Sequence, residues 1–386
     1  MNAASPSKAR YIMIGGFLGA GKTTAVSRLA ARLSARGLRV GLITNDQGAN
    51  LADTALLRSR GFATEEIPGG CFCCRFNSLV EAARNLTAST RPEVFIAEPV
   101  GSCTDLAATV AYPLRRLYGA EFTLAPVSAL LDPVRALRIL GLEPGPAFSP
   151  KVAYIYKKQI EDADLVVLNK ADLVDAARLE CLRAALASAY PGKEIHTVSA
   201  REETGLDAWF DRLTRDEQTA RNAMEVDYAV YAEGEALLGW LNATVQIAAP
   251  GGTFDADRLL AWLAAEIQRG LRTREAEVAH LKMTLSPDGG VGGGIASINL
   301  VRNDAVPELA FHLEDPVVSG QLIVNLRAEA APEDLAAVLR AALALLPRTF
   351  PGLSAALEHL EHFRPGKPNP THRIACLPGS RAFRPF

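Results

Sequence analysis

The chain has 386 residues, which exceeds what a single hydrophobic core normally holds, so we expect two or three domains. Hydrophobic residues make up 49% and charged residues 22% of the chain, a composition typical of a globular protein. The net charge of −2 gives no field that would attract nucleic acid or an anionic membrane, and no run of about 18 apolar residues is present. The polar N-terminus is unlike a signal peptide. We therefore expect a cytoplasmic protein with neither a nucleic-acid nor a membrane partner.

The first elements predicted along the chain form a βαβ unit. Residues 10–15 are a short apolar run that favours a strand, and a glycine-rich loop follows at 15–21. Residues 22–36 carry apolar side chains at helical spacing, and Gly37 ends the predicted helix. A second apolar strand is predicted over 38–44. Strand, loop, helix and strand at this spacing are typical of an α/β layer fold.

The alternation of strands and helices continues through the first half of the chain. Helical stretches, for example 174–189, separate further short apolar segments. The strands predicted there are 93–97, 122–131, 164–168 and 194–198. We therefore expect residues 1–222 to form an α/β domain with a mostly parallel sheet flanked by helices.

A polar stretch at 212–227 marks the predicted domain boundary. Beyond it, clustered strands accompany two predicted helices, at 254–270 and 332–346. This pattern favours a smaller α+β domain over residues 228–348, of the split-βαβ, ferredoxin-like kind. Residues 349–386 are rich in Pro and Arg and are predicted to form an extended tail.

A phosphate-binding loop is the first chemical motif. The segment from Gly16 to Thr23 fits G-x-x-x-x-G-K-[ST], and it lies between a predicted strand and a predicted helix, as the motif requires. Its backbone N–H groups would surround the phosphates, Lys22 would reach the β- and γ-phosphate oxygens, and the Thr23 hydroxyl would bind Mg²⁺. This motif alone does not separate GTPases, ATPases and small-molecule kinases. The nucleotide contacts expected here are Gly16, Gly19, Ala20, Gly21, Lys22, Thr23 and Thr24.

A guanine-reading element follows the strand at 164–168. It is the N-K-x-D sequence that contains Asn169, Lys170 and Asp172. The Asp172 carboxylate can accept hydrogen bonds from the N1–H and the exocyclic amine of guanine, whereas adenine offers no such pair of donors. Lys170 would lie along the base and Asn169 would tie neighbouring loops together. A second guanine-contacting loop is expected at Ser199, Ala200 and Arg201, and the two loops together predict GTP as the nucleotide.

Two acidic residues follow predicted strands at positions suited to magnesium and to the attacking water. Asp46 ends the second strand, and Glu98 occupies the Walker B position, with Gly101 close behind it. Asp46 and Glu98 are candidate Mg²⁺ ligands with Thr23, and together with Lys22 they are the candidate catalytic residues. Gly101 would place a backbone N–H near the γ-phosphate. No glutamine stands out to position water, so we expect slow hydrolysis of GTP.

Three thiols lie within four positions, at Cys71, Cys73 and Cys74. Thiolates suit Zn²⁺, and Co²⁺ binds the same type of site, so this cluster is a candidate metal centre. A fourth position would be left to water, to an exchanging partner, or to a residue such as Glu66, Asp46 or Cys103. The alternatives are a redox pair, a buried cysteine patch and a purely structural zinc.

The order of five motifs resembles the CobW-like subgroup of P-loop GTPases, which are relatives of the nickel-handling HypB and UreG proteins. The motifs are GGFLGAGKTT, ND, GGCFCC, EPVG and QIEDADLVVLNKAD, all between about residues 10 and 205. The resemblance implies a GTP-gated metallochaperone that delivers a metal to a target metalloenzyme or helps to mature it. Many members carry a His-rich stretch, but this chain has only 6 His, which weakens any role in metal storage.

Two other functions remain open from the sequence. One is a GTP-gated chaperone that remodels or protects a cofactor enzyme, for example a corrinoid enzyme, with a zinc that is only structural. The other is a small-molecule kinase, against which the guanine-reading element argues. A nucleotide-dependent homodimer is a further prediction. In the switch hypothesis, GTP and Mg²⁺ order the segments after Asp46 and around Glu98 and thereby change the thiolate site that lies between them.

Overall fold

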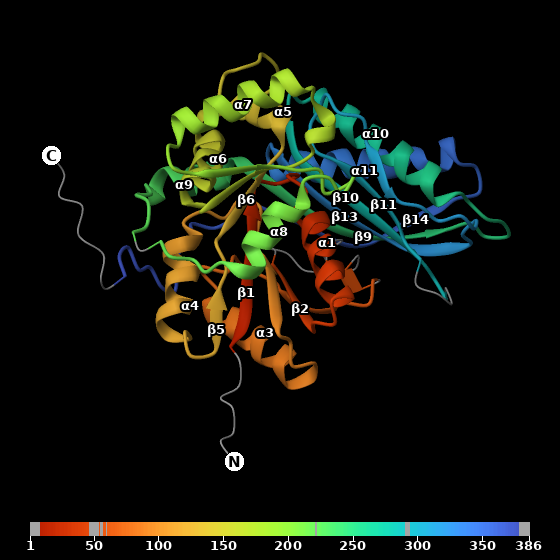
Figure 1. Cartoon of the computed structure of the whole chain (residues 1–386). Coiled ribbons are helices and arrows are strands. Elements are labelled where there is room, and N and C mark those ends of the chain that lie inside the picture. Colours follow the sequence, from red (N-terminus) through yellow and green to blue (C-terminus); the bar gives the residue numbers. More distant parts are fainter. Residues whose placement is uncertain are drawn as a thin grey trace.

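The computed structural model describes residues 8–45, 54, 57–58, 60–220, 222–289 and 294–377. Within them the chain forms two sheets, each with its own hydrophobic core, and Figure 1 shows the two sheets side by side. None of the helices in this described part has the length and apolar character needed to cross a membrane.

The first sheet is parallel at every pairing between its strands, which confirms the predicted α/β class. Its order is β3-β2-β4-β1-β6-β7-β8, and β5 also pairs with β1. The predicted strand 122–131 is two strands, because residues 122–124 and 128–131 pair with different parts of β1. The strands are β1 (Ala9–Gly16), β2 (Val40–Asn45), β3 (Ala63–Ile67), β4 (Val94–Glu98), β5 (Phe122–Leu124), β6 (Ser128–Leu131), β7 (Leu165–Leu168) and β8 (Glu194–Thr197).

Helices cover both faces of this sheet. Apolar side chains of α1 and α8 pack in one core, and those of α3, α4 and α6 pack in another. Aspartate side chains cap the N-termini of α5 and α7. Asp132 accepts from the Arg135 N–H, and Asp175 accepts from the Arg178 N–H. The helices are α1 (Lys22–Ala35), α3 (Phe76–Ser89), α4 (Tyr112–Leu117), α5 (Pro133–Ile139), α6 (Pro150–Asp162), α7 (Ala176–Ala189), α8 (Leu206–Arg215) and α9 (Tyr228–Leu237), with a π-helical turn at Ala107–Ala111 and a 3₁₀ turn at Ala171–Leu173.

Helix α9 belongs to the packing of the first sheet, so placing the second domain from residue 228 is wrong for this helix. It lies against α6, and a side chain at Gly234 would meet the Lys151 carbonyl oxygen at 2.5 Å. Tyr231 is 1% exposed and packs in the core of the first sheet. The sequence analysis assigned α9 to the second domain because this helix follows the polar stretch at 212–227.

The second sheet is antiparallel and has the order β12-β11-β10-β13-β9-β14. β9 and β10 are joined through α10 and are separated in the sheet by β13, which is the split-βαβ arrangement that the sequence predicts. β11 and β12 extend one edge. The elements are β9 (Leu238–Ala248), α10 (Ala256–Arg272), β10 (Glu277–Pro287), β11 (Ala296–Leu300), β12 (Glu308–Phe311), β13 (Ser319–Glu329), α11 (Pro332–Thr349) and β14 (Ser354–Phe363).

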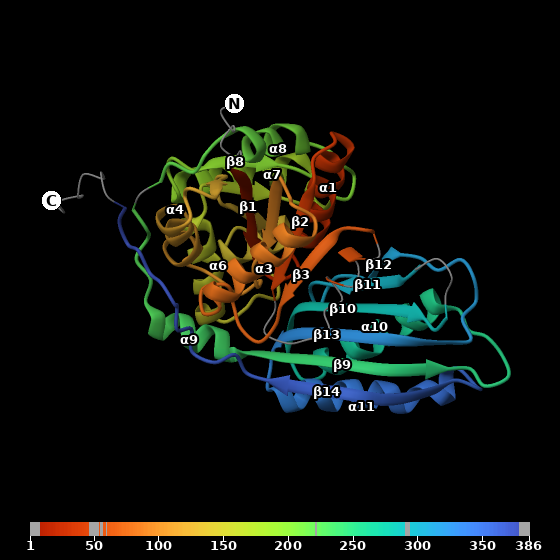
Figure 2. The same ribbon diagram turned by 90° about the horizontal axis from the view of Figure 1, so that it is seen from below.

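The predicted tail contains the edge strand of this sheet. Residues 354–363 form β14, which pairs with β9, so the prediction of an extended tail over 349–386 is wrong for this segment. The Pro and Arg content that suggested a tail is concentrated after Phe363, whereas 354–363 contains neither Pro nor Arg. Figure 2 shows the chain leaving β14 and running back past α9 toward the first sheet.

The two faces of the second sheet differ in chemistry. Leu281, Met283 and Val324 are fully buried in the core beneath α10 and α11. The alternating residues point the other way, toward the first domain, and there Lys282 lies in register with Asn299 on one side and Asn325 on the other. This sheet therefore presents a polar face to the first domain.

Candidate functional site

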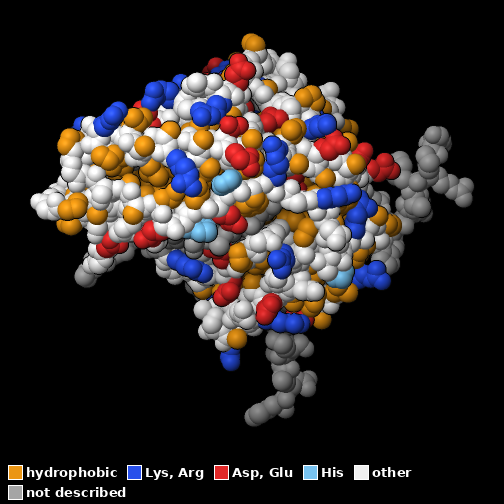
Figure 3. Space-filling view, turned by 180° about the vertical axis from the view of Figure 1, so that it is seen from behind, with side chains coloured by type: hydrophobic (Ala, Val, Ile, Leu, Met, Phe, Trp, Pro, Cys, Tyr) orange, Lys and Arg blue, Asp and Glu red, His pale blue; other side chains and the backbone are white. Residues whose placement is uncertain are grey.

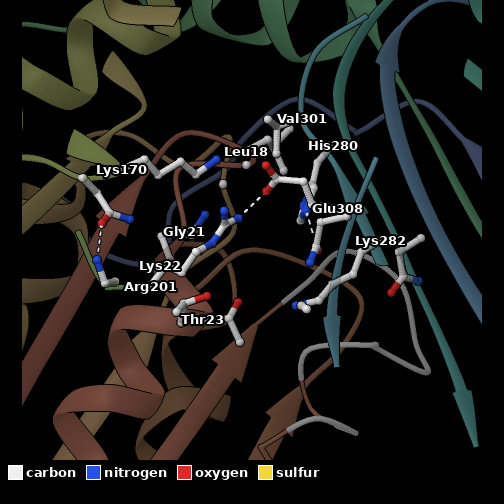
Figure 4. Close-up of a pocket in the computed structure, with 18 of the residues that line it drawn as sticks. Leu18, Gly21, Lys22, Thr23, Lys170, Arg201, His280, Lys282, Val301 and Glu308 are labelled. Carbon is white, nitrogen blue, oxygen red and sulfur yellow. Dashed lines mark hydrogen bonds and ion pairs between the residues drawn. The ribbon is translucent and has the colours of Figure 1, made fainter. Parts of the chain in front are cut away.

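A cavity of about 540 Å³ lies between the two sheets, at the carboxyl ends of the parallel strands. Figure 4 shows that its walls come from both halves of the chain, with Lys22 and Thr23 on one side and His280 and Lys282 on the other. Among the predicted nucleotide contacts, the cavity is lined by Gly19, Gly21, Lys22, Thr23, Thr24, Gly101, Asn169, Lys170, Ala200 and Arg201. Gly16, Ala20, Asp172 and Ser199 are not in its lining.

The phosphate loop connects β1 to α1 at the floor of this cavity. Gly16 has a φ of 125°, and a side chain there would meet the Leu130 carbonyl oxygen at 2.3 Å, so the loop requires glycine at this turn. The Lys22 ammonium donates to the Phe17 carbonyl at 3.3 Å, which directs the lysine across the loop. A cradle of backbone with a buried lysine at a helix N-terminus has the chemistry of a phosphate site.

The candidate magnesium residues Thr23 and Glu98 are in contact. The Thr23 hydroxyl donates to Glu98 Oε1 at 3.0 Å, and both side chains are buried. A hydroxyl and a carboxylate at this distance are hard oxygen donors that suit Mg²⁺ beside phosphates. Gly101 lies so close to the phosphate loop that a side chain there would meet the Leu18 nitrogen at 3.0 Å. Asp46, the other acidic candidate, lies outside the described residues.

Asn169 joins the three loops around the predicted guanine site. Its amide donates to the Ala20 carbonyl at 2.8 Å, and its Oδ1 accepts from the Ala200 N–H at 3.0 Å. A side chain at Gly21 would meet Asn169 Nδ2 at 2.4 Å, so glycine is needed for this approach. Asp172 is exposed in the 3₁₀ turn, where its carboxylate is accessible to a base.

Lys170 is held by a carboxylate that the sequence analysis did not single out. Its ammonium lies 3.1 Å from Asp132 Oδ2, and Arg302 from the second domain lies 3.2 Å from Oδ1 of the same carboxylate. Burial alone would raise the pKa of Asp132, but the charges of Lys170, Arg302 and Arg135 outweigh it and lower the pKa to about 2. An aspartate before proline at the end of a strand was the available signal, and its partners are too distant in sequence to be inferred.

Arg135 fastens the phosphate loop to the second sheet. It is buried, and its guanidinium donates to the Leu18 carbonyl at 3.2 Å, to the Val278 carbonyl at 3.2 Å and to the Val301 carbonyl. Arg201 adds an ion pair to Glu308 across the same gap. The phosphate loop at the cavity and the second sheet are therefore joined by direct contacts.

The three predicted metal ligands form a compact group at the start of α3. The Cys71 sulfur lies 2.7 Å from that of Cys73 and 3.2 Å from that of Cys74, and the Cys73 and Cys74 sulfurs are 3.7 Å apart. A tetrahedral zinc ion with Zn–S bonds of about 2.3 Å spaces its sulfurs by about 3.8 Å, so a small opening of this group fits the ion. Within the described part of the chain, this is the group of Cys, His and carboxylate side chains that could hold a metal.

The pKa values of the three thiols differ, and that of Cys71 is the one that is lowered. The pKa of Cys71 is well below its ordinary value because the Cys103, Cys73 and Cys74 thiols hydrogen-bond to it. The hydrogen bond with Cys71 raises the pKa of Cys73, and it raises that of Cys74 to about 11. Cys71 is therefore the thiol of this group that most readily becomes a thiolate, which is the form that binds a divalent cation.

The C-terminal segment covers this group. The Thr371 N–H donates to the Cys73 carbonyl at 2.8 Å, and the Asn369 N–H donates to the Cys74 sulfur at 3.2 Å. The His372 ring packs edge-on against Phe76, with the centroids 4.9 Å apart. Sequence analysis missed these contacts because they join residues almost 300 positions apart.

Comparison with known proteins supports this picture. Residues 10–197 match the family model described as CobW/HypB/UreG, nucleotide-binding domain. The chain is 31% identical over 229 residues to a protein named zinc chaperone CobW from Sinorhizobium sp, a match that covers 53% of this chain and 60% of that protein. It is 31% identical over 166 residues to zinc chaperone YeiR from Escherichia coli K12, covering 42% of this chain and 47% of that protein. The chain thus spans about half to three-fifths of these relatives.

Solved structures that align with this chain include HypB from Helicobacter pylori in complex with nickel, at 17% identity and a TM-score of 0.40, covering 55% of this chain and 91% of that one. Zn(II)-bound YjiA GTPase from E. coli aligns at 15% identity and a TM-score of 0.38, covering 87% of this chain and 99% of that one. The family match spans the phosphate loop, the Walker B strand, the thiol group and the guanine-reading sequence. Residues 10–197 of this chain belong to the CobW/HypB/UreG nucleotide-binding domain family.

Proposed function

We propose that this protein is a GTPase whose nucleotide state controls metal binding at Cys71, Cys73 and Cys74. The observation that carries the proposal is the position of Asn45. Its side chain lines the nucleotide cavity, and its amide donates to the Ile67 carbonyl at 2.9 Å and to the Gly70 carbonyl at 2.6 Å. The residue that ends β2 at the cavity thus holds the backbone that leads directly into Cys71. A change at the cavity is thereby passed to the thiol group.

The phosphate chemistry follows from the residues around the loop. Lys22 binds the β- and γ-phosphate oxygens and offsets the negative charge that develops on the transferred phosphoryl group. Thr23 and Glu98 would hold Mg²⁺, which would supply positive charge beside the phosphates. Positioning and charge neutralisation are the main catalytic contributions in such sites, so hydrolysis of GTP to GDP and phosphate proceeds slowly without a dedicated water-positioning side chain. Asp46 remains a candidate for that role.

Guanine is selected by hydrogen bonding. Asp172 accepts from the base, Lys170 lies along its plane, and Ser199, Ala200 and Arg201 close the pocket from the adjacent loop. The ion pair with Asp132 fixes the position of the Lys170 ammonium, so that the lysine stem would lie along a bound base. A base that lacks the two donors would forfeit hydrogen bonds to a charged carboxylate, each worth about 1.5–3 kcal/mol.

The metal is the cargo, and we propose Zn²⁺ or Co²⁺. Both ions accept thiolate ligands in a tetrahedral arrangement, and two relatives carry the name zinc chaperone. The recipient is a target metalloenzyme in the cytoplasm that is loaded or matured in one nucleotide state. On the face shown in Figure 3 basic and acidic side chains are interspersed, so a protein recipient is favoured over an extended polyanion.

The experiment is a titration of Zn²⁺ and Co²⁺ against a competing chelator, with the GTP analogue and Mg²⁺, with GDP, and without nucleotide. We expect the affinity to change at least tenfold between nucleotide states, about 1.4 kcal/mol of coupling. Cys71→Ser should weaken binding in every state, whereas Cys181→Ser, which changes an exposed thiol on α7, should leave it unchanged. Lys22→Ala, which loses nucleotide binding, should bind metal with one affinity throughout. Equal affinity of the parent protein in all states would overturn the proposal.

The second candidate is a chaperone that remodels a cofactor enzyme and carries a structural zinc. It is favoured by the burial of the thiols, since Cys73 is 1% exposed and the C-terminal segment lies over the group. Capture of partners from the native cytoplasm separates the two functions, because metal delivery predicts an apo-metalloenzyme and remodelling predicts a cofactor enzyme. Light scattering with GTP analogue tests the predicted nucleotide-dependent homodimer at the same time.

A further inference from the structure

One short segment of the second domain contacts the first domain around the cavity. It is the segment 301–308, which follows β11 and ends at the first residue of β12. The phosphate loop lies against its first residue, since a side chain at Gly19 would meet Val301 Cγ1 at 2.9 Å. Figure 4 shows Val301 and Glu308 on the second-domain side of the cavity. The segment is therefore part of the cavity wall as well as a link between two strands.

The same segment holds a charged side chain from each predicted guanine loop. Arg302 lies 3.2 Å from Asp132 Oδ1, and Lys170 lies 3.1 Å from Oδ2 of that carboxylate. Glu308 forms an ion pair with Arg201. The side chains of Arg302 and Asp132 are only 11% and 3% exposed, so water and salt screen their ion pair weakly. The segment therefore influences where the Lys170 ammonium and the Arg201 guanidinium lie.

Exposed apolar side chains from both domains line the same cavity. Val306 is 78% exposed, and Leu173, which directly follows Asp172, is 37% exposed. Covering such side chains with an apolar surface removes them from water, which is favourable. A purine base has a flat surface of this kind on each face. Lys170 would lie along one face of the base, which leaves the other face for an apolar contact.

Helix α10 holds the segment in place. The buried Gln268 side chain donates to the Asn303 carbonyl at 2.9 Å and to the Ala305 carbonyl at 2.6 Å. The Asn303 amide in turn donates to the Ala276 carbonyl at 2.6 Å. A segment tied at its centre presents Val306 in a defined place, so little conformational entropy is lost when a base binds against it.

We propose that residues 301–308 form the outer wall of the guanine site. Val306 covers the face of the base that Lys170 leaves open, and Arg302 positions Lys170 through the carboxylate that they share. This inference rests on the proposed function and adds residues of the second domain to its base site. Because Val306 and Arg302 act at the base, GTP and GDP gain equally from this wall.

The first test is Val306→Ser in the full-length protein. Titration calorimetry measures its affinity for the GTP analogue, for GDP and for inorganic triphosphate, each with Mg²⁺. We expect both guanine nucleotides to bind about fivefold more weakly, a smaller change than full burial of a valine would give, and inorganic triphosphate, which has no base, to bind as it does to the parent. Val318→Ser is the matched control, because Val318 is a 59% exposed valine of the second domain outside the cavity lining.

A double-mutant cycle tests whether Arg302 acts through Lys170. We expect Arg302→Gln alone to weaken the binding of the GTP analogue by about tenfold. Added to Lys170→Met, it should cause no further loss, because the lysine that it positions is then absent. Arg274→Gln is the control, since Arg274 pairs with Asp334 at an exposed place.

The outcomes separate this inference from the function on which it rests. If Val306→Ser and Arg302→Gln bind the GTP analogue as the parent does, or lose affinity for inorganic triphosphate by the same factor, the inference is wrong while the proposed GTPase stands. Additive losses in the cycle would also contradict it. Should the double variant not fold, Arg302→Lys replaces it, and an affinity as low as that of Arg302→Gln would overturn the positioning role. A parent protein that binds no GTP analogue would overturn the proposed function itself.

Discussion

At the scale of single residues, the proposed selectivity for guanine depends on Asp172. We predict that Asp172→Asn weakens GTP binding by about 10- to 100-fold, because an amide cannot accept from both guanine donors, a loss of about 1–3 kcal/mol. Isothermal titration with GTP and ATP analogues measures the change, and the preference for GTP should shrink accordingly. Asp175→Asn is the control, since Asn also caps α7 and lies outside the base site. If Asp172→Asn still selects GTP over ATP as the parent does, the assignment of Asp172 as the guanine-reading residue is wrong.

Replacing Asp132 should lower the free energy of unfolding more than replacing an exposed carboxylate. Asp132 is buried and balances Lys170, Arg302 and Arg135, so Asp132→Asn leaves these cations without their carboxylate. We predict a loss of about 3–5 kcal/mol in the free energy of unfolding, measured by urea denaturation. Asp207→Asn, which breaks an exposed ion pair with Arg32, should cost less than about 1 kcal/mol. Similar losses for the two variants would contradict the buried network.

At the scale of elements, the end of α6 contains a pH-sensitive contact. Asp162 accepts from the backbone N–H groups of Leu106 and Ala107 at the start of the π-helical turn. Burial raises its pKa from 3.8 to about 7. Between these values the folded state binds the proton and the unfolded state does not, so this group's contribution to stability falls as the pH rises from about 4 to about 7.

Asp162→Asn removes that titration. The difference in unfolding free energy between parent and variant, measured by denaturation at several pH values, should therefore move against the parent as the pH rises through this window and level off above it. A difference that stays constant from pH 4 to pH 8 would show that Asp162 does not hold the proton. Asp211→Asn on the exposed side of α8 serves as the control.

Among the elements of this fold, the sequence predicts those whose patterns are local. The phosphate loop and the strand before N-K-x-D are local patterns, since short-range spacing determines both the turn and the apolar run. β14 and β3 escaped because each is a sheet-edge strand whose pattern mixes small, apolar and charged residues, and only pairing with β9 or β2 makes it a strand. Asn45 and Asp132 acquire their roles through contacts between distant residues, which the sequence alone does not reveal.

At the scale of the whole molecule, Arg135 couples the two domains. Arg135→Lys keeps the charge beside Asp132 but loses the planar fork that reaches the carbonyls of Leu18, Val278 and Val301. We predict that thermal unfolding, a single transition in the parent, splits into two in the variant, and that the affinity for GTP falls by about tenfold. Calorimetry measures the first effect, and Arg269→Lys on the exposed face of α10 is the control. One unsplit transition in both variants would contradict the coupling.

The polar face of the second sheet connects the coupling of the two domains to the cavity. Its residues complete the wall of the cavity, so a nucleotide bound there would contact both domains. Asn45 joins the cavity to the backbone before the thiol group, and the returning C-terminal segment closes over the same group. The cavity, the thiol group and both domains are therefore joined by one set of contacts, which is the arrangement that the proposed reciprocal switch requires.

Reciprocity gives the most direct test of the account. The affinity for a non-hydrolysable GTP analogue is measured with and without saturating Zn²⁺, in the parent protein and in Cys71→Ser. Because linkage is symmetrical, Zn²⁺ must change the affinity for the analogue by the same factor by which the analogue changes the affinity for Zn²⁺. We predict a change of at least tenfold, or about 1.4 kcal/mol, in the parent protein. In Cys71→Ser we predict no change. An affinity for the analogue that is indifferent to Zn²⁺ in the parent would show that the metal and the nucleotide are not coupled in this protein.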